Sequence, residues 1–119
     1  MPIITLEYTS NLPIDSEIKS FVLNMHHFLV KEINTDLRTC RSTIVKHGNF
    51  IIADGDKKNA YIMLTIRMLP GRSDELKKRV GTLLLQTIKE HFADCMTKFD
   101  VQTRVYLTET DTPHYYGLE

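Results

Sequence analysis

Pro2 is the residue of this chain that could carry the most distinctive chemistry. It follows Met1 directly, and a small residue in second position usually lets the cell remove the initiating methionine. The mature chain would then begin with a secondary amine, which is both a base and a nucleophile. An α-amino group titrates at about 7.7–8.0, and apolar surroundings lower the pKa of an amine. Pro2 is therefore a candidate general base, although a Met-Pro start also occurs by chance.

Two arginines could bind the carboxylate of an acidic substrate. Arg72 follows a Pro-Gly pair and precedes an expected helix, whose N-terminus favours anions. Arg41 lies where the first expected helix leads into the second strand. A guanidinium binds a carboxylate through two parallel hydrogen bonds. Each could equally be a solvated surface arginine, so their role depends on whether the fold brings them to Pro2.

The other residues that commonly carry chemistry form weaker patterns. His26 and His27 are adjacent on an expected helix, so their side chains point about 100° apart and do not share one metal. Cys40 and Cys95 form no Cys-x-x-Cys pattern, and the sequence has no glycine-rich phosphate loop. We therefore expect no metal and no disulfide.

Length and charge limit the classes of protein to which the chain can belong. Its 119 residues predict one domain over residues 1–119, and 15 basic residues balance 15 acidic ones. Zero net charge gives no support to a nucleic-acid-binding protein, which normally has a basic surplus. No apolar segment approaches the ~20 residues of a membrane span, and no signal peptide is visible. With free thiols, the chain is predicted to be cytoplasmic, without nucleic acid or membrane as a partner.

Two helices and four strands are expected to position these residues. Apolar residues at helical spacing predict helices over residues 16–33 and 74–96, with Asp15 and Ser73 as N-caps. The second helix is expected to bury Leu76, Val80, Leu83, Leu84, Ile88 and Phe92. Segments that are rich in β-branched residues, or that alternate, predict strands over residues 2–8, 42–52, 60–69 and 101–108.

The two halves of the chain resemble copies of one β-α-β unit. The segments from about 2 to 53 and from about 60 to 109 are each expected to form a strand, a helix and a second strand. Their helices align at a spacing of 58 residues. Right-handed crossovers would pair the strands of each unit in parallel and place both helices on one face of a four-stranded sheet. The predicted fold class is therefore α/β (α+β). The other sheet face, which includes Tyr61 and Met63, would be left open for self-association.

Short motifs in a fixed order connect the chain with a known family. They are the Met-Pro start with its apolar strand, Arg41-Ser42, Ala53-Asp54-Gly55, Gly71-Arg72-Ser73 and Ile88-Lys89-Glu90-His91-Phe92. In these motifs and in its duplicated layout, the chain resembles the 5-carboxymethyl-2-hydroxymuconate isomerase family of the tautomerase superfamily. The resemblance covers nearly the whole chain.

The resemblance implies a fold, an assembly and an activity. The fold is the tautomerase-like fold of two fused β-α-β units, assembled as a homotrimer. The activity is that of a 5-carboxymethyl-2-hydroxymuconate delta-isomerase of homoprotocatechuate degradation, a step in aromatic compound catabolism. The amino-terminal proline moves a double bond in a small unsaturated keto or dicarboxylic acid through a dienolate, without cofactor or metal. Pro2, Arg41 and Arg72 match the catalytic proline and two arginines of the family. Ile3 replaces the histidine of some members, which leaves the exact substrate open.

Two other functions stay open at this point. The same fold would serve a keto–enol tautomerase of the phenylpyruvate type, which would differ in the shape of its pocket. It would also serve a catalytically silent trimeric binding protein, which a retained Met1 or an Arg72 turned away from Pro2 would favour. A ferredoxin-like nucleic-acid module is disfavoured, because net charge is zero and basic and aromatic residues do not alternate on the strands.

Overall fold

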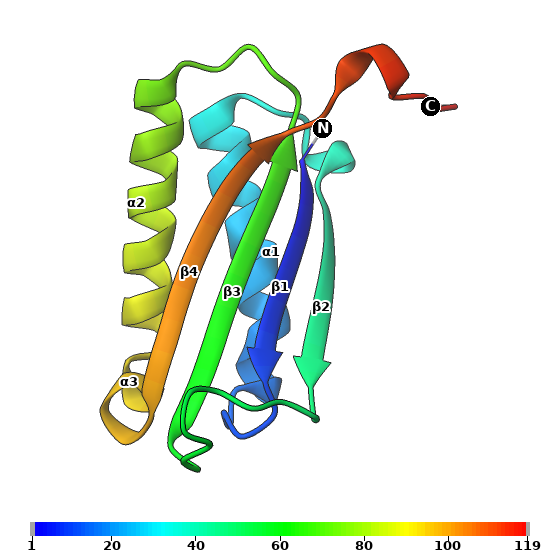
Figure 1. The fold of residues 1–119 in the computed structure, drawn as a ribbon. Helices are drawn as coiled ribbons and strands as arrows, with labels where there is room; N and C mark the ends of the chain where they lie inside the picture. Colours follow the sequence, from blue (N-terminus) through cyan, green and yellow to red (C-terminus); the bar gives the residue numbers. More distant parts are fainter. Residues whose placement is uncertain (1, 119) are drawn as a thin grey trace.

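The computed structural model describes residues 2–118, in which four strands form one mixed sheet and two long helices cover one of its faces (Figure 1). The strands stand in the order β2-β1-β3-β4. Their bounds are β1 Ile3–Thr9, β2 Arg41–His47, β3 Asn59–Met68 and β4 Asp100–Glu109, and the long helices are α1 Asp15–Ile33 and α2 Asp74–His91. This arrangement confirms the predicted fold class. The expected removal of Met1 lies outside the described residues.

Each parallel pair of strands is connected by a helix. α1 joins β1 to β2, and α2 with the short helix α3 (Ala93–Lys98) joins β3 to β4. The central strands β1 and β3 run antiparallel. The remaining short elements are two 3₁₀ turns, η1 (Leu37–Thr39) and η2 (Thr112–His114). Both halves thus share one order of elements, while the duplication itself stays a prediction.

The core lies between the sheet and the two helices. Alternate residues of the central strands face the helices and are buried, as the twofold periodicity of a strand requires. They are Ile4, Leu6 and Tyr8 of β1 and Ala60, Ile62, Leu64, Ile66 and Met68 of β3. The intervening residues of both strands, apart from the buried Thr9, are less buried, because no element within residues 2–118 covers that face. We call it the open face; it is the face on which Tyr61 and Met63 were expected.

The two helix starts are built differently. Ser73 is the N-cap of α2, as predicted, and its Oγ accepts a hydrogen bond from the Leu76 backbone nitrogen at 3.1 Å. The prediction that Asp15 caps the first helix was wrong. Ile14 precedes α1 without a side-chain cap, and Asp15 is the first helical residue. Its carboxylate instead accepts hydrogen bonds from Tyr8 of β1 and from Lys46 of β2.

The second helix is shorter than predicted. It ends at His91, because Phe92 leaves helical geometry with φ −106° and ψ 35°. The Phe92 ring stays buried against Phe21, with ring centroids 5.1 Å apart, and the chain continues as α3 in a new direction. Leu83 was expected in the core but is 36% exposed. The buried stripe of α2 consists of Val80, Leu84 and Ile88, which are spaced by four residues.

The second strand also ends earlier than predicted. β2 lies at the edge of the sheet and pairs only with β1. Since β1 ends at Thr9, opposite His47, residues 48–52 have no strand beside them and leave the sheet. The third and fourth strands agree with the prediction to within one residue at each end. In the part of the chain that the structure describes, no helix has the length and apolar character needed to cross a bilayer.

Candidate active site

The three predicted site residues come from segments that meet at one end of the sheet. Pro2 precedes β1, and the strand register places Arg41 of β2 beside Ile3. β3 runs antiparallel to β1, so its last residues lie beside the beginning of β1, and the loop that carries Arg72 leaves from there. Figure 1 shows the beginning of β1 at this end, next to the end of β3 and the beginning of β2. We call it the Pro2 end of the sheet.

Pro2 is held by the first hydrogen bond of the β1–β2 ladder. The Pro2 carbonyl oxygen accepts a hydrogen bond from the Arg41 backbone nitrogen at 3.3 Å, and Pro2 itself is buried. Burial favours the neutral form of an amine over its charged form. A free nitrogen at this position would therefore meet two needs of a general base, a fixed location and an unprotonated form.

Arg72 is anchored to the main chain on two sides. Its Nε and Nη2 donate hydrogen bonds to the Ile33 carbonyl oxygen at 3.2 and 3.1 Å, and its Nη1 donates to the Leu69 carbonyl oxygen at 3.1 Å. Ile33 is the last residue of α1, where carbonyl groups lack partners within the helix. Arg72 thus ties the C-terminus of α1 to the loop between β3 and α2. This structural role was not predicted.

The anchoring of Arg72 leaves part of its guanidinium available. An arginine has five N–H donors, and three of them are used in the bonds to Ile33 and Leu69, so two remain. Gly71 makes the turn that brings Arg72 back toward α1. Its φ of 120° is one that residues with a side chain rarely adopt.

Arg41 opens β2 with its side chain on the open face. It is exposed, and its Cα partner in β1 is Ile3. Directly paired residues project to the same side of a sheet. Arg41 and Ile3 therefore lie together on the open face at the Pro2 end.

A further arginine, Arg67 of β3, lies at the same place and was not predicted. It is the Cα partner of Ile3 on the other side of β1 and is exposed on the open face. Ile3 therefore has Arg41 on one side and Arg67 on the other. The alternation of residues 60–69 already placed Arg67 opposite to the apolar face, but only the strand order shows that β3 lies beside β1.

The cysteine and histidine near this end are both partly buried. Burial raises the pKa of the Cys40 thiol, which favours a plain thiol over a thiolate. The Nε2 of His26 lies 2.6 Å from Ser42 Oγ, and burial, followed by the neighbouring His27, lowers its pKa. Within residues 2–118, no three histidine, cysteine, aspartate or glutamate side chains are grouped to hold a metal ion.

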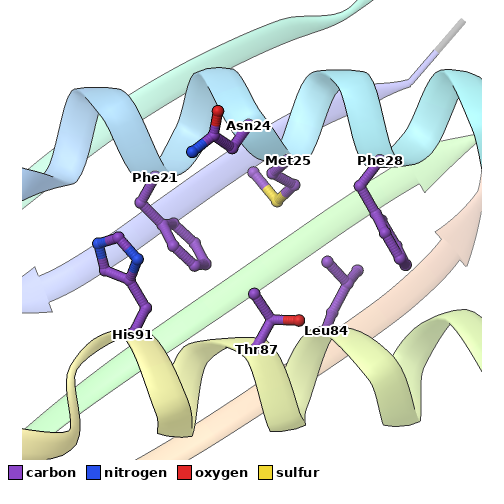
Figure 2. A pocket seen from close by; sticks show the side chains of 7 residues that line it. All are labelled: Phe21, Asn24, Met25, Phe28, Leu84, Thr87 and His91. Carbon is purple, nitrogen blue, oxygen red and sulfur yellow. The ribbon is translucent and has the colours of Figure 1, made fainter.

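A separate cavity lies on the helix side of the molecule. It has a volume of about 110 Å³ and opens between α1 and α2 (Figure 2). Its lining is mostly apolar and consists of Phe21, Asn24, Met25, Phe28, Leu84, Thr87 and His91. None of Pro2, Arg41, Arg67 and Arg72 belongs to this lining, so the cavity is distinct from the Pro2 end.

Comparisons with known proteins agree on one family and one fold. A sequence model described as 5-carboxymethyl-2-hydroxymuconate isomerase matches residues 2–117. No curated protein matches by sequence. A solved 5-carboxymethyl-2-hydroxymuconate isomerase from Deinococcus radiodurans R1 has a TM-score of 0.87 at 25% identity, over 98% of this chain and 88% of that chain.

Two further solved structures share the fold at lower identity. A 5-carboxymethyl-2-hydroxymuconate delta-isomerase has a TM-score of 0.81 at 16% identity, over 100% of this chain and 89% of that chain. A fused 4-OT described as a wild type symmetric trimer has a TM-score of 0.73 at 18% identity, over 98% of this chain and 93% of that chain.

Proposed function

We propose that Pro2 moves a double bond in a small unsaturated keto or dicarboxylic acid, because the chain belongs to the 5-carboxymethyl-2-hydroxymuconate isomerase family. The family match confirms the resemblance predicted from the motifs, and the chain is an isomerase of the tautomerase superfamily. The proposal concerns the mechanism, the substrate and the residues that act on it.

In the proposed reaction, Pro2 acts first as a base and then as an acid. The neutral secondary amine takes a proton from the carbon next to the substrate carbonyl, or from the enol hydroxyl of a substrate supplied as a dienol, and the electrons of the broken bond stay in a dienolate. The resulting prolinium returns the proton at the far end of the conjugated system. The double bond has then moved, the proton count is unchanged, and no electrons enter or leave. The burial of Pro2 supports this role, because it favours the neutral amine with which the cycle begins.

The arginines bind the substrate and stabilise the charge that develops on it. In the proposal, Arg41 holds a carboxylate from the open face, and the two remaining donors of Arg72 face the negative oxygen of the dienolate. Fixed donors at a developing charge are often the largest contribution to catalysis. Because Arg72 also anchors the loop after β3, its position would be set before the substrate arrives.

The observation that carries the proposal is the convergence of Pro2, Arg41 and the Arg72 loop at one end of the sheet. Pro2→Ala should lower kcat for ketonisation of a 2-hydroxymuconate dienol by at least about 100-fold, because a positioned general base contributes about that much. Pro13→Ala, at an exposed position before α1, is the matched control and should keep full activity. Wild-type turnover by a folded Pro2→Ala variant would refute the proposal.

The open face supports a proposal about assembly. No element of the described chain covers it, and a solved relative in fold is described as a symmetric trimer. We propose that this chain forms a homotrimer in which the open face is covered by the other copies. We also propose that it acts in the cytoplasm, in homoprotocatechuate degradation; Cys40 and Cys95 are unpaired thiols, as expected in a reducing compartment.

A further inference from the structure

We propose that Ser42 is a nucleophile with His26 as its general base, and that together they take an acyl group from a small activated ester. This activity is separate from the function proposed for Pro2, because it uses other residues and the helix side of the sheet. It starts from one contact, in which His26 Nε2 of α1 lies 2.6 Å from Ser42 Oγ of β2. A serine hydroxyl that is hydrogen-bonded to an imidazole is the arrangement that activates serine for acyl transfer.

A strand and a helix hold this contact in place. Ser42 is the Cα partner of Ile4, whose side chain is buried on the helix side of the sheet, so Ser42 also faces that side. His26 lies in the middle of α1, next to the buried Met25, and its ring reaches Ser42. Both side chains are only partly buried. A small molecule can therefore reach the pair from solvent.

His26 has the protonation state that a general base needs. Burial, followed by the neighbouring His27, lowers the pKa of His26 below its usual value of 6.5. The imidazole is therefore mainly neutral at neutral pH. In the tautomer that carries its proton on Nδ1, the Nε2 atom accepts the hydrogen bond from the Ser42 hydroxyl. The proposal uses this tautomer, because it can take the hydroxyl proton as Ser42 attacks.

The backbone of Ser42 offers a donor for the negative charge that develops in such a reaction. β2 is an edge strand, and the Arg41 backbone nitrogen points toward β1, where it donates to the Pro2 carbonyl oxygen. Successive backbone nitrogens of a strand point to opposite sides, so the Ser42 N–H points to the outer edge of β2. No strand in the described part of the chain pairs with that edge. The Ser42 N–H can thus donate to the oxyanion of an intermediate that forms on its own side chain.

The proposed acyl transfer balances in atoms and in charge. Ser42 Oγ forms a bond to the carbonyl carbon of the ester while His26 Nε2 takes the hydroxyl proton, and the carbonyl oxygen becomes negative. When this tetrahedral intermediate collapses, the carbon–oxygen bond to the leaving alcohol breaks. The alcohol takes the proton from His26, which becomes neutral again, and Ser42 is left as an ester. No oxidation or reduction takes place.

Acetylation by p-nitrophenyl acetate tests the proposal in the wild-type protein. The protein is treated at neutral pH and digested, and mass spectrometry follows the acetylation of each residue with time. Ser42 should be acetylated at least about 10-fold faster than Ser20, because a positioned base contributes about 100-fold and Ser42 is less exposed. Ser20 is the matched serine, since its hydroxyl donates to the Glu17 carbonyl oxygen instead. The label on Ser42 should persist in Pro2→Ala.

Two histidine variants test whether His26 is the base. His26→Gln should slow the acetylation of Ser42 by about 100-fold, because glutamine does not take up the proton. His27→Gln is the matched control, since His27 is the next residue of α1 and is exposed, and it should keep the wild-type rate. Circular dichroism checks that both variants fold. If His26→Gln does not, the comparison of Ser42 with Ser20 in the wild type decides.

Three outcomes would overturn the proposal. The first is a wild-type protein in which Ser42 is acetylated no faster than Ser20. The second is a folded His26→Gln variant that still acetylates Ser42 at the wild-type rate. The third is an equal loss in His27→Gln, which would show that the effect does not depend on the contact between His26 and Ser42.

Discussion

Tyr8 is a polar residue whose hydroxyl is held at the edge of the core. Its side chain is 3% exposed, and its hydroxyl donates a hydrogen bond to Asp15 Oδ1 at 2.6 Å. Lys46 Nζ donates to the other oxygen of the same carboxylate at 2.6 Å. Burial, followed by the hydrogen bond and the charge of Asp15, raises the pKa of Tyr8 to about 12. The folded state therefore favours the neutral, protonated form of the Tyr8 hydroxyl.

This raised pKa predicts how stability depends on alkaline pH. The folded state holds the Tyr8 proton more tightly than the unfolded chain, whose tyrosines titrate near roughly 10. The stabilisation that the protonated Tyr8 hydroxyl gives the folded state is fully present below that pH. It is lost as the pH rises toward about 12, the pKa of Tyr8 in the folded state. In denaturant titrations, the free energy of unfolding of the wild type should therefore fall with rising pH in this range. Tyr8→Phe should reduce the steepness of that fall by up to about 1.4 kcal/mol per pH unit. Tyr116→Phe, at an exposed position, should leave the slope unchanged; equal slopes in wild type and Tyr8→Phe would contradict the assignment.

Single residues could be selected as site candidates where residue type and position in the chain were enough to suggest a role. Pro2 and Arg41 could be selected from residue type and position in the chain, although their catalytic roles stay predictions. The anchoring of Arg72 could not be foreseen, because its partner Ile33 is a backbone carbonyl 39 residues away. Arg67 was missed because its significance depends on the neighbour of β3, which the alternation of a strand does not reveal.

The sheet presents a face on which apolar and charged residues are mixed. Tyr61 and Met63 of β3 are only partly buried within one chain, while the helix-facing residues of the same strand are fully covered. On this face, Arg41 and Arg67 lie at the Pro2 end, and Glu7, which pairs with His47, lies toward the opposite end of the sheet. A partner that covers this face would therefore bury apolar area in the middle of the sheet.

The proposed assembly can be tested by placing a charge on this face. Met63→Asp should shift the chain from trimer to monomer in sedimentation equilibrium, because a carboxylate buried in an interface loses its hydration without gaining a partner. Leu23→Asp is the matched control, since Leu23 is 56% exposed on α1, away from the sheet, and should remain trimeric. If both variants assemble as the wild type does, the open face is not the interface.

Elements were predicted more reliably in type than in extent. Periodicity indicated every long helix and strand, because apolar residues at spacings of two or of three to four report one buried face. Their ends depend on contacts that periodicity does not contain. β2 stops where β1 provides no further partner, and α2 stops where Phe92 packs against Phe21.

At the scale of the whole molecule, the site depends on how the two β-α-β units join. Helical crossovers account for the parallel pairs within each unit. The antiparallel pairing of β1 with β3 then places the start of the chain beside the end of the third strand. Pro2 and Arg41 already meet within the first unit, and Arg67 and the Arg72 loop are brought beside them by this join. The repeat and right-handed crossovers predicted a four-stranded sheet with both helices on one face, but not the order of its strands.

The most direct measurement compares chains that differ only at the Pro2 nitrogen. Intact mass would identify one preparation that begins with Pro2 and another in which one residue still precedes it, so that its nitrogen is an amide without basicity. Ketonisation of 2-hydroxymuconate by the two is then measured at neutral pH. If Pro2 is the general base, the extended chain should be slower by at least about 100-fold, with every side chain of the site still in place. Equal rates would show that the reaction does not use the Pro2 nitrogen.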